Sequence, residues 1–211
     1  MIEQPDEAEL NARANEKARK RKEARARMLA TKTIEKGLLI VHTGKGKGKS
    51  TAAFGLAIRA VGNGMRVGIV QFVKGKWDTG ERHVFERFPD QVDIRTMGEG
   101  FTWETQDRAR DIMAATAAWE TSRTMIDACK GSSPKYHLVI LDELNIVLRY
   151  GYLPLEDVVA FLAQKPAALH VVVTGRNAKP ELIEIADLVT EMTLVKHPFL
   201  AGVKAQKGIE F

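Results

Sequence analysis

The chain has 211 residues, of which 45% are hydrophobic and 28% charged, a composition typical of one globular domain with a full-sized core. Its single cysteine, Cys129, excludes an internal disulfide and fits a reducing compartment. No apolar run approaches the ~18 residues of a membrane helix, and the acidic start MIEQPDEAEL is unlike a secretory signal. We therefore expect a cytoplasmic protein without a membrane partner.

The net charge of +5 is concentrated near the amino terminus, where residues 13–27 hold eight basic and two acidic side chains. Residues 1–36 are predicted to form a basic arm, helical from 12 to 30, whose apolar stripe is too thin to order it without a partner surface. A solvated helix, an arm that binds a polyanion or a partner, and a nucleic-acid-binding arm all fit this composition. The arm has no aromatic residue to stack on bases, which disfavours single-strand binding.

From residue 37 to residue 211, short apolar runs alternate with helical patterns. Strands are predicted at 38–42, 66–72, 92–96, 137–143, 169–175 and 188–195, and helices at 49–64, 106–130, 154–165 and 179–186. Because most of these strands are continuous apolar runs, we predict an α/β fold of three layers, with a parallel sheet flanked by helices. Ligands of such sheets bind beyond the carboxyl ends of the strands.

The segment HTGKGKGKSTAAFG (42–55) follows the first predicted strand and opens a helix. A phosphate-binding loop has a glycine, four residues, and then Gly-Lys-Ser/Thr, but here position 43 is Thr43 and the loop is one residue short. Glycines let backbone N–H groups turn toward a phosphate, and the helix N-terminus adds partial positive charge. We predict a phosphate site, rather than only a basic turn, formed by Gly44, Lys45, Gly46, Lys47, Gly48, Lys49, Ser50 and Thr51.

Within this loop, Lys49 is the residue expected to reach phosphate oxygens, and the Ser50 hydroxyl is expected to face Mg²⁺. The strand HLVILDE (137–143) ends in Asp142 and Glu143, which are hard oxygen donors suited to the same ion. The simpler alternative is that these carboxylates only complement a helix N-terminus. In an ordinary ATPase, Glu143 would instead act as the base that activates water.

The segment GFTWET (100–105) follows the third predicted strand at the expected binding edge. Phe101 and Trp103 would there be either core anchors or a hydrophobic wall for a large, flat ligand. A simple phosphohydrolase has no need of such a wall.

Several segments, in order, resemble the ATP:corrinoid adenosyltransferases of the bacterial type, whose P-loop NTPase fold is like the RecA core. The resemblance runs from about residue 36 to the carboxyl terminus and rests on TGKGKGKSTAAFG, VGIVQFVKG, GFTWET, LDEL, YLPLEDV, VTGR and VKHPFLAGVKAQKGIEF. It implies transfer of the 5′-deoxyadenosyl group of ATP to Co(I) of a corrinoid, with release of triphosphate. The short loop would hold ATP reversed, with triphosphate as leaving group and C5′ facing the corrinoid.

The resemblance also implies roles for individual residues. Phe101 and Trp103 would lie under the corrinoid and displace its lower axial ligand, while Lys49 would assist the chemistry. Glu143, with Asp142 beside it, would hold Mg²⁺, and Arg59 and Arg176 would contact the nucleotide. Lys45 departs from the small polar residue expected there, and this difference is expected to bear on how tightly the loop binds triphosphate.

The family further suggests that the arm is a lid over the corrinoid, that the protein is a homodimer, and that a reduced flavoprotein supplies electrons. Two other functions stay open on the residues alone: a nucleic-acid-stimulated RecA-like ATPase, and a regulatory nucleotide-binding module without turnover. The ATP product separates the three, and GFTWET beside a short loop favours the adenosyltransferase, with no nucleic-acid partner.

Overall fold

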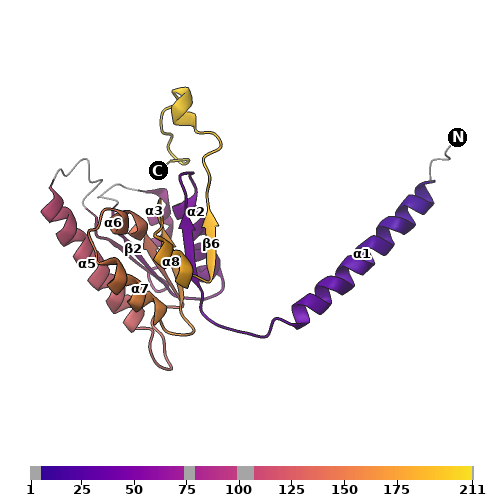
Figure 1. The fold of residues 1–211 in the computed structure, drawn as a ribbon, viewed down its shortest axis with the longest axis horizontal. Coiled ribbons are helices and arrows are strands. Elements are labelled where there is room, and N and C mark those ends of the chain that lie inside the picture. Colours follow the sequence, from indigo (N-terminus) through magenta and orange to yellow (C-terminus); the bar gives the residue numbers. More distant parts are fainter. Residues whose placement is uncertain (1–5, 74–78, 99–106, 211) are drawn as a thin grey trace. The chain divides into compact units, whose positions relative to one another are not determined.

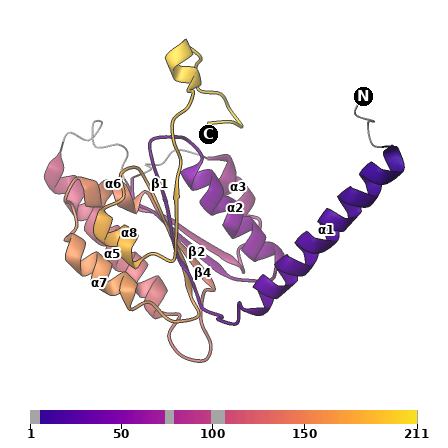
Figure 2. The ribbon, with the colours of Figure 1, turned by 45° about the vertical axis from the view of Figure 1, so that its right-hand side comes forward.

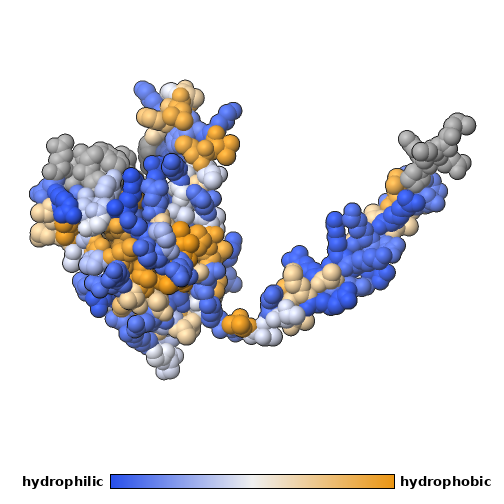
Figure 3. Space-filling view, in the orientation of Figure 1, coloured by the Kyte–Doolittle hydropathy of each residue, from blue (hydrophilic) through white to orange (hydrophobic). Residues whose placement is uncertain are grey.

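The computed structural model describes residues 6–73, 79–98 and 107–210, and it separates the chain into two compact units, 1–35 and 36–211. In the first unit, the helix α1 (Glu7–Ala30) begins at Asp6, whose carboxylate accepts a hydrogen bond from the backbone N–H of Glu9 at 2.7 Å. Salt bridges between residues four apart, such as Arg19–Glu23, support the helix along its length. None of its residues is buried, and its surface is largely hydrophilic (Figure 3).

The second unit is built on six parallel strands in the order β3-β2-β4-β5-β1-β6. Their bounds are β1 Leu39–Thr43, β2 Val67–Gln71, β3 Val92–Thr96, β4 Leu138–Asp142, β5 His170–Thr174 and β6 Leu188–Glu191. The helices are α2 Lys49–Gly62, α3 Gly80–Phe85, α5 Arg108–Asp127, α6 Leu144–Arg149, α7 Leu155–Ala163 and α8 Pro180–Ile185, followed by the 3₁₀ helix η1 Pro198–Ala201. The predicted three-layer α/β fold with a parallel sheet is therefore confirmed (Figure 1).

The two faces of the sheet carry separate cores. On one face, α2 and α3 pack through Phe54 and Phe85, whose rings meet edge to face with centroids 5.7 Å apart. On the other face, α5 to α8 cover the sheet, and Trp119 packs edge to face on Phe161. Figure 2 shows these two helical layers on either side of the strands. The strand β5 lies between β1, which leads into the glycine-rich loop, and β4, which ends at Asp142.

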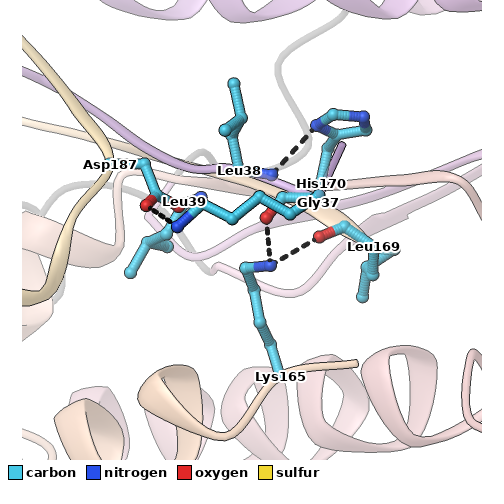
Figure 4. A network of polar contacts seen from close by, with 8 residues as sticks. Gly37, Leu38, Leu39, Lys165, Leu169, His170 and Asp187 are labelled. Carbon is cyan, nitrogen blue, oxygen red and sulfur yellow. Dashed lines mark hydrogen bonds and ion pairs between the residues drawn. The ribbon is translucent and has the colours of Figure 1, made fainter. Parts of the chain in front are cut away.

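Polar groups fix the amino end of β1, where the chain enters the sheet (Figure 4). The Lys165 ammonium group donates hydrogen bonds to the carbonyl oxygens of Gly37 at 2.7 Å and Leu169 at 2.8 Å. The backbone N–H of Leu38 donates to His170 Nδ1 at 3.1 Å, so this nitrogen carries no proton. Burial and the neighbouring Lys165 lower the pKa of His170, in agreement with a neutral ring.

Asp187 secures the same edge from the loop before β6. Its Oδ2 accepts a hydrogen bond from the backbone N–H of Leu39 at 2.9 Å, and its Oδ1 forms an ion pair with Lys36. The Lys36 hydrogen bond, followed by the Leu39 N–H, holds the pKa of Asp187 below its usual value. These contacts set the register of β1 and thereby the position of the loop that follows it.

No helix in the described part of the chain is both long enough and apolar enough to cross a membrane.

Candidate active site

Every strand of the sheet ends in a polar residue at its carboxyl edge. In spatial order these residues are Thr96, Gln71, Asp142, Thr174, Thr43 and Glu191. Four of them, Gln71, Asp142, Thr174 and Thr43, are buried. All of these except Thr43 directly follow an apolar residue of their strand. Buried polar groups are costly unless they are paired, so their concentration at one edge marks it as the functional edge of the sheet.

The glycine-rich loop joins the last residue of β1 to the first turn of α2. Gly44 and Gly48 adopt φ angles of 98° and 102°, which favour glycine, and Gly46 donates its N–H to the carbonyl oxygen of Met192 at 2.7 Å. The Lys49 ammonium group folds back onto the carbonyl oxygen of Gly46. Ser50 and Thr51 lie in the first turn of α2, directly after Lys49.

The chain that follows β6 forms an outer wall of this loop. A Cβ atom on Gly44 would lie 2.4 Å from the carbonyl oxygen of Met192, and one on Gly46 would lie 2.6 Å from that of Thr193. Further along, Glu210 forms an ion pair with Lys47. Positions 44 and 46 therefore have room for glycine only. The carboxyl-terminal segment contacts the loop through backbone atoms at these two positions and through the Glu210 side chain at Lys47.

Lys49 lies among several charged groups. Burial lowers its pKa most strongly, Arg176 and Lys47 lower it further, and Glu143 acts in the opposite direction. Arg176, Lys47 and Glu143 are therefore the charged groups to which the Lys49 ammonium group is electrostatically coupled. Three cations and one carboxylate thus surround a short glycine-rich loop at a helix N-terminus, an arrangement suited to a polyphosphate and a divalent cation.

Asp142 and Glu143 lie at the carboxyl end of β4 but have different surroundings. Asp142 is fully buried, and its Oδ1 accepts a hydrogen bond from the Thr174 hydroxyl at 2.8 Å. Its Oδ2 lies 3.4 Å from the amide nitrogen of Gln71. Glu143 has a left-handed φ of 68° and donates its backbone N–H to the Thr174 hydroxyl at 2.9 Å. Asp142 is thus integrated into the sheet edge, whereas Glu143 begins the turn into α6.

Arg176 is held by the turn between β5 and α8. The preceding residue, Gly175, has a φ of 126°, and a Cβ there would lie 2.8 Å from the Cβ of Asn145. The fully buried Asn145 donates its side-chain amide to the Gly175 carbonyl oxygen at 3.1 Å. Its Oδ1 accepts no hydrogen bond from any residue that the structure describes. Asn145 therefore links the turn that carries Arg176 to the turn that carries Glu143.

The structure brings together most of the residues that the sequence singles out. Lys45 and Lys47 are exposed on the loop, and Lys49, Arg176 and Glu143 are near one another. Arg59 is not part of this group, because it lies in the last turn of α2, about 15 Å along the helix axis from Lys49. Phe101 and Trp103 lie outside the described residues.

Sequence reasoning missed Gln71, Asn145 and Thr174. The signal for Gln71 and Thr174 was available, since each is a polar residue that directly follows a run of apolar strand residues. Asn145 gave no such signal, because an asparagine within LDELNIVL has no pattern that marks it as buried.

The chain matches the model of a family described as ATP:corrinoid adenosyltransferase BtuR/CobO/CobP over residues 35–211. It is 55% identical to a corrinoid adenosyltransferase of Sinorhizobium sp., over 95% of this chain and 92% of the relative. It is 53% identical to one of Pseudomonas aeruginosa, over 96% and 98% of the two chains. It is 48% identical to the corrinoid adenosyltransferase CobA of Salmonella typhimurium, over 84% and 87%.

Proposed function

Because the chain belongs to the ATP:corrinoid adenosyltransferase family, we propose that it transfers the 5′-deoxyadenosyl group of ATP to the Co(I) ion of a corrinoid, in the biosynthesis or salvage of adenosylcobalamin. The cobalt ion belongs to the substrate and acts as the nucleophile. Its electron pair forms the bond to C5′, the C5′–O5′ bond breaks, and that electron pair leaves on inorganic triphosphate. No side chain has to attack, so the work of the protein is to position the reactants and stabilise charge.

The observation that carries this proposal is the cationic group around the short loop. Lys49 lies close to Lys47 and Arg176, and burial already lowers the pKa of Lys49. Binding of a polyanion would stabilise such a site, because it would offset the repulsion among the cations. Preorganised cations and backbone N–H groups stabilise the charge that develops on the departing triphosphate. Gly44, Lys45, Gly46, Gly48, Ser50 and Thr51 complete the proposed phosphate site, and Arg59 stays a more distant candidate.

The donor groups at the end of β4 fit a magnesium ion. Mg²⁺ prefers oxygen ligands and is usually held by one or two carboxylates together with substrate phosphates. Glu143 and the Ser50 hydroxyl would be direct ligands, with Asp142 behind Glu143. The ion would neutralise phosphate charge and so make triphosphate a better leaving group. Glu143 already acts electrostatically on Lys49, which supports a position beside the phosphates.

Four further parts of the proposal rest on the family resemblance. Phe101 and Trp103 form the hydrophobic wall under the corrinoid, where removal of the lower axial ligand makes Co(II) easier to reduce. The arm of residues 1–36 is a lid over the corrinoid. A reduced flavoprotein supplies the electrons. The protein is a cytoplasmic homodimer.

The test is incubation of the protein with ATP, Mg²⁺ and a corrinoid chemically reduced to Co(I). The expected result is the absorption spectrum of the adenosylated corrinoid, formed only when protein, ATP and corrinoid are all present. An ATPase that nucleic acid stimulates would instead consume ATP without corrinoid, faster when DNA or RNA is added. The latter result would contradict the proposal.

A further inference from the structure

The Thr174 hydroxyl at the end of β5 joins two residues of the neighbouring strand. It donates a hydrogen bond to Asp142 Oδ1 at 2.8 Å and accepts one from the backbone N–H of Glu143 at 2.9 Å. A hydroxyl has one proton to donate and two lone pairs that accept, so a single group can serve both neighbours. Thr174 is fully buried.

The hydrogen bond to Glu143 acts at an unusual backbone position. Glu143 has a φ of 68°, between the last residue of β4 and the first residue of α6. Residues other than glycine adopt this region at a cost, and they do so where surrounding contacts hold them in place. The Thr174 hydroxyl is such a contact. The residue held in this conformation is the one whose carboxylate acts electrostatically on the Lys49 ammonium group.

Asp142 is also held from the side opposite Thr174. The amide nitrogen of Gln71, on β2, lies 3.4 Å from Asp142 Oδ2. The Gln71 amide oxygen in turn accepts a hydrogen bond from the Thr96 hydroxyl, on β3, at 2.9 Å. A continuous row of polar contacts therefore crosses four adjacent strands, β3, β2, β4 and β5, and ends at the backbone of Glu143. These contacts hold Asp142 in place, so the hydroxyl proton of Thr174 has a fixed acceptor and the orientation of the hydroxyl is fixed as well.

We propose that Thr174 is a positioning residue for the magnesium–ATP site: through its hydroxyl it holds the Glu143 backbone in the conformation that presents the carboxylate beside Lys49. This inference rests on the proposed function, because it takes Glu143 as a direct ligand of the ion. It makes Asp142 the anchor of Thr174 more than a ligand in its own right. Residues that orient metal ligands in this way typically change metal affinity by about 10–100-fold when they are replaced.

The experiment compares Thr174→Val, which removes the hydroxyl at nearly constant shape, with Thr174→Ser, which keeps it. ATP binding is measured by calorimetry without corrinoid, in EDTA and over a series of Mg²⁺ concentrations. For Thr174→Val we expect the Mg²⁺ concentration that gives half of the maximal change in ATP affinity to rise about 10–100-fold. The affinity for ATP in EDTA should be unchanged. Thr174→Ser is expected to match the unmodified protein. Equal Mg²⁺ dependence in Thr174→Val and the unmodified protein would overturn the inference.

Two controls separate positioning from a structural role. Thr121→Val removes a hydroxyl that donates a hydrogen bond to Ala117 O within its own helix, and it should change neither measurement. In a Glu143→Gln background, Thr174→Val should have little further effect on the Mg²⁺ dependence, since both changes act through one ligand. Additive losses in the double variant would contradict action through Glu143.

Thermal unfolding is recorded for each variant, because a buried hydroxyl is being removed. If Thr174→Val does not fold, Thr174→Cys replaces it, since a thiol is a weak donor and acceptor at the same position. A loss in Thr174→Ser as large as in the other variants would also refute the inference. If the unmodified protein binds ATP without any response to Mg²⁺, the magnesium site of the proposed function fails instead.

Discussion

Gly44 and Gly48 of the phosphate loop are predicted to differ in their tolerance of a single methyl group. Both have left-handed φ angles, 98° and 102°, so Gly→Ala costs about 1–2 kcal/mol of backbone strain at either position. At Gly48 the new Cβ would meet only Met192 Sδ at 3.6 Å, an ordinary contact. At Gly44 it would lie 2.4 Å from the Met192 carbonyl oxygen, and overpacking against backbone adds about 1–3 kcal/mol.

Gly48→Ala should therefore lower the free energy of unfolding by about 1–2 kcal/mol, and Gly44→Ala by about 2–5 kcal/mol. Equilibrium unfolding in urea, without ATP, measures both. A suitable control is Gly55→Ala within α2, where a Cβ would meet nothing within 4 Å. This substitution should raise the free energy of unfolding by about 0.5–1 kcal/mol. If Gly44→Ala is no less stable than Gly48→Ala, the close packing of the carboxyl-terminal segment on the loop is refuted.

Three further predictions concern charge and the aromatic pair. Lys49→Met should slow adenosylation about 10²–10³-fold. It should also raise the melting temperature of the ligand-free protein at neutral pH, because the lowered pKa of Lys49 means that its charge opposes folding. This gain in melting temperature should shrink as the pH rises toward 10.5, and a lowered melting temperature at neutral pH would contradict the prediction. Asp187→Asn should destabilise the protein at pH 7, because Lys36 lowers the pKa of Asp187. The difference in stability from the unmodified protein should fade below about pH 4 as the carboxylate is protonated. A difference in stability that is independent of pH would contradict the ion pair. Trp103→Ala should be slow when the assay starts from Co(II) with a protein reductant but recover most of its rate from Co(I); equal losses with a lowered melting temperature would indicate a core anchor.

The sheet could be predicted because its strands are short apolar runs. The strand predicted at 92–96 is observed as β3, and the other five predicted strands match observed ones to within two residues at their amino ends. The last predicted strand, 188–195, was too long, since β6 ends at Glu191. There Met192 donates to the Thr43 carbonyl oxygen and accepts from Gly46, so the chain turns to follow the phosphate loop. That contact is tertiary and leaves no mark on the local pattern.

The short helices α3 and α6 were missed for a related reason. Each has six residues, too few to show a helical period, and α6 follows directly on Glu143 without a conventional capping residue. Candidate site residues could be named from the sequence where a motif carries them, as in the loop and in Asp142–Glu143. Thr174 could be marked as a polar strand end, but its contacts could not be predicted, and Asn145 could not be predicted at all, because both roles depend on β5 and β4 lying side by side.

The most direct test of the central claim is the identity of the phosphorus product. The protein is incubated with ATP, Mg²⁺ and a Co(I) corrinoid, and the phosphate species are followed by ³¹P NMR alongside the corrinoid spectrum. One inorganic triphosphate is expected for each adenosylated corrinoid, because the bond that breaks is C5′–O5′. Accumulation of ADP and inorganic phosphate, with the corrinoid unchanged, would contradict it.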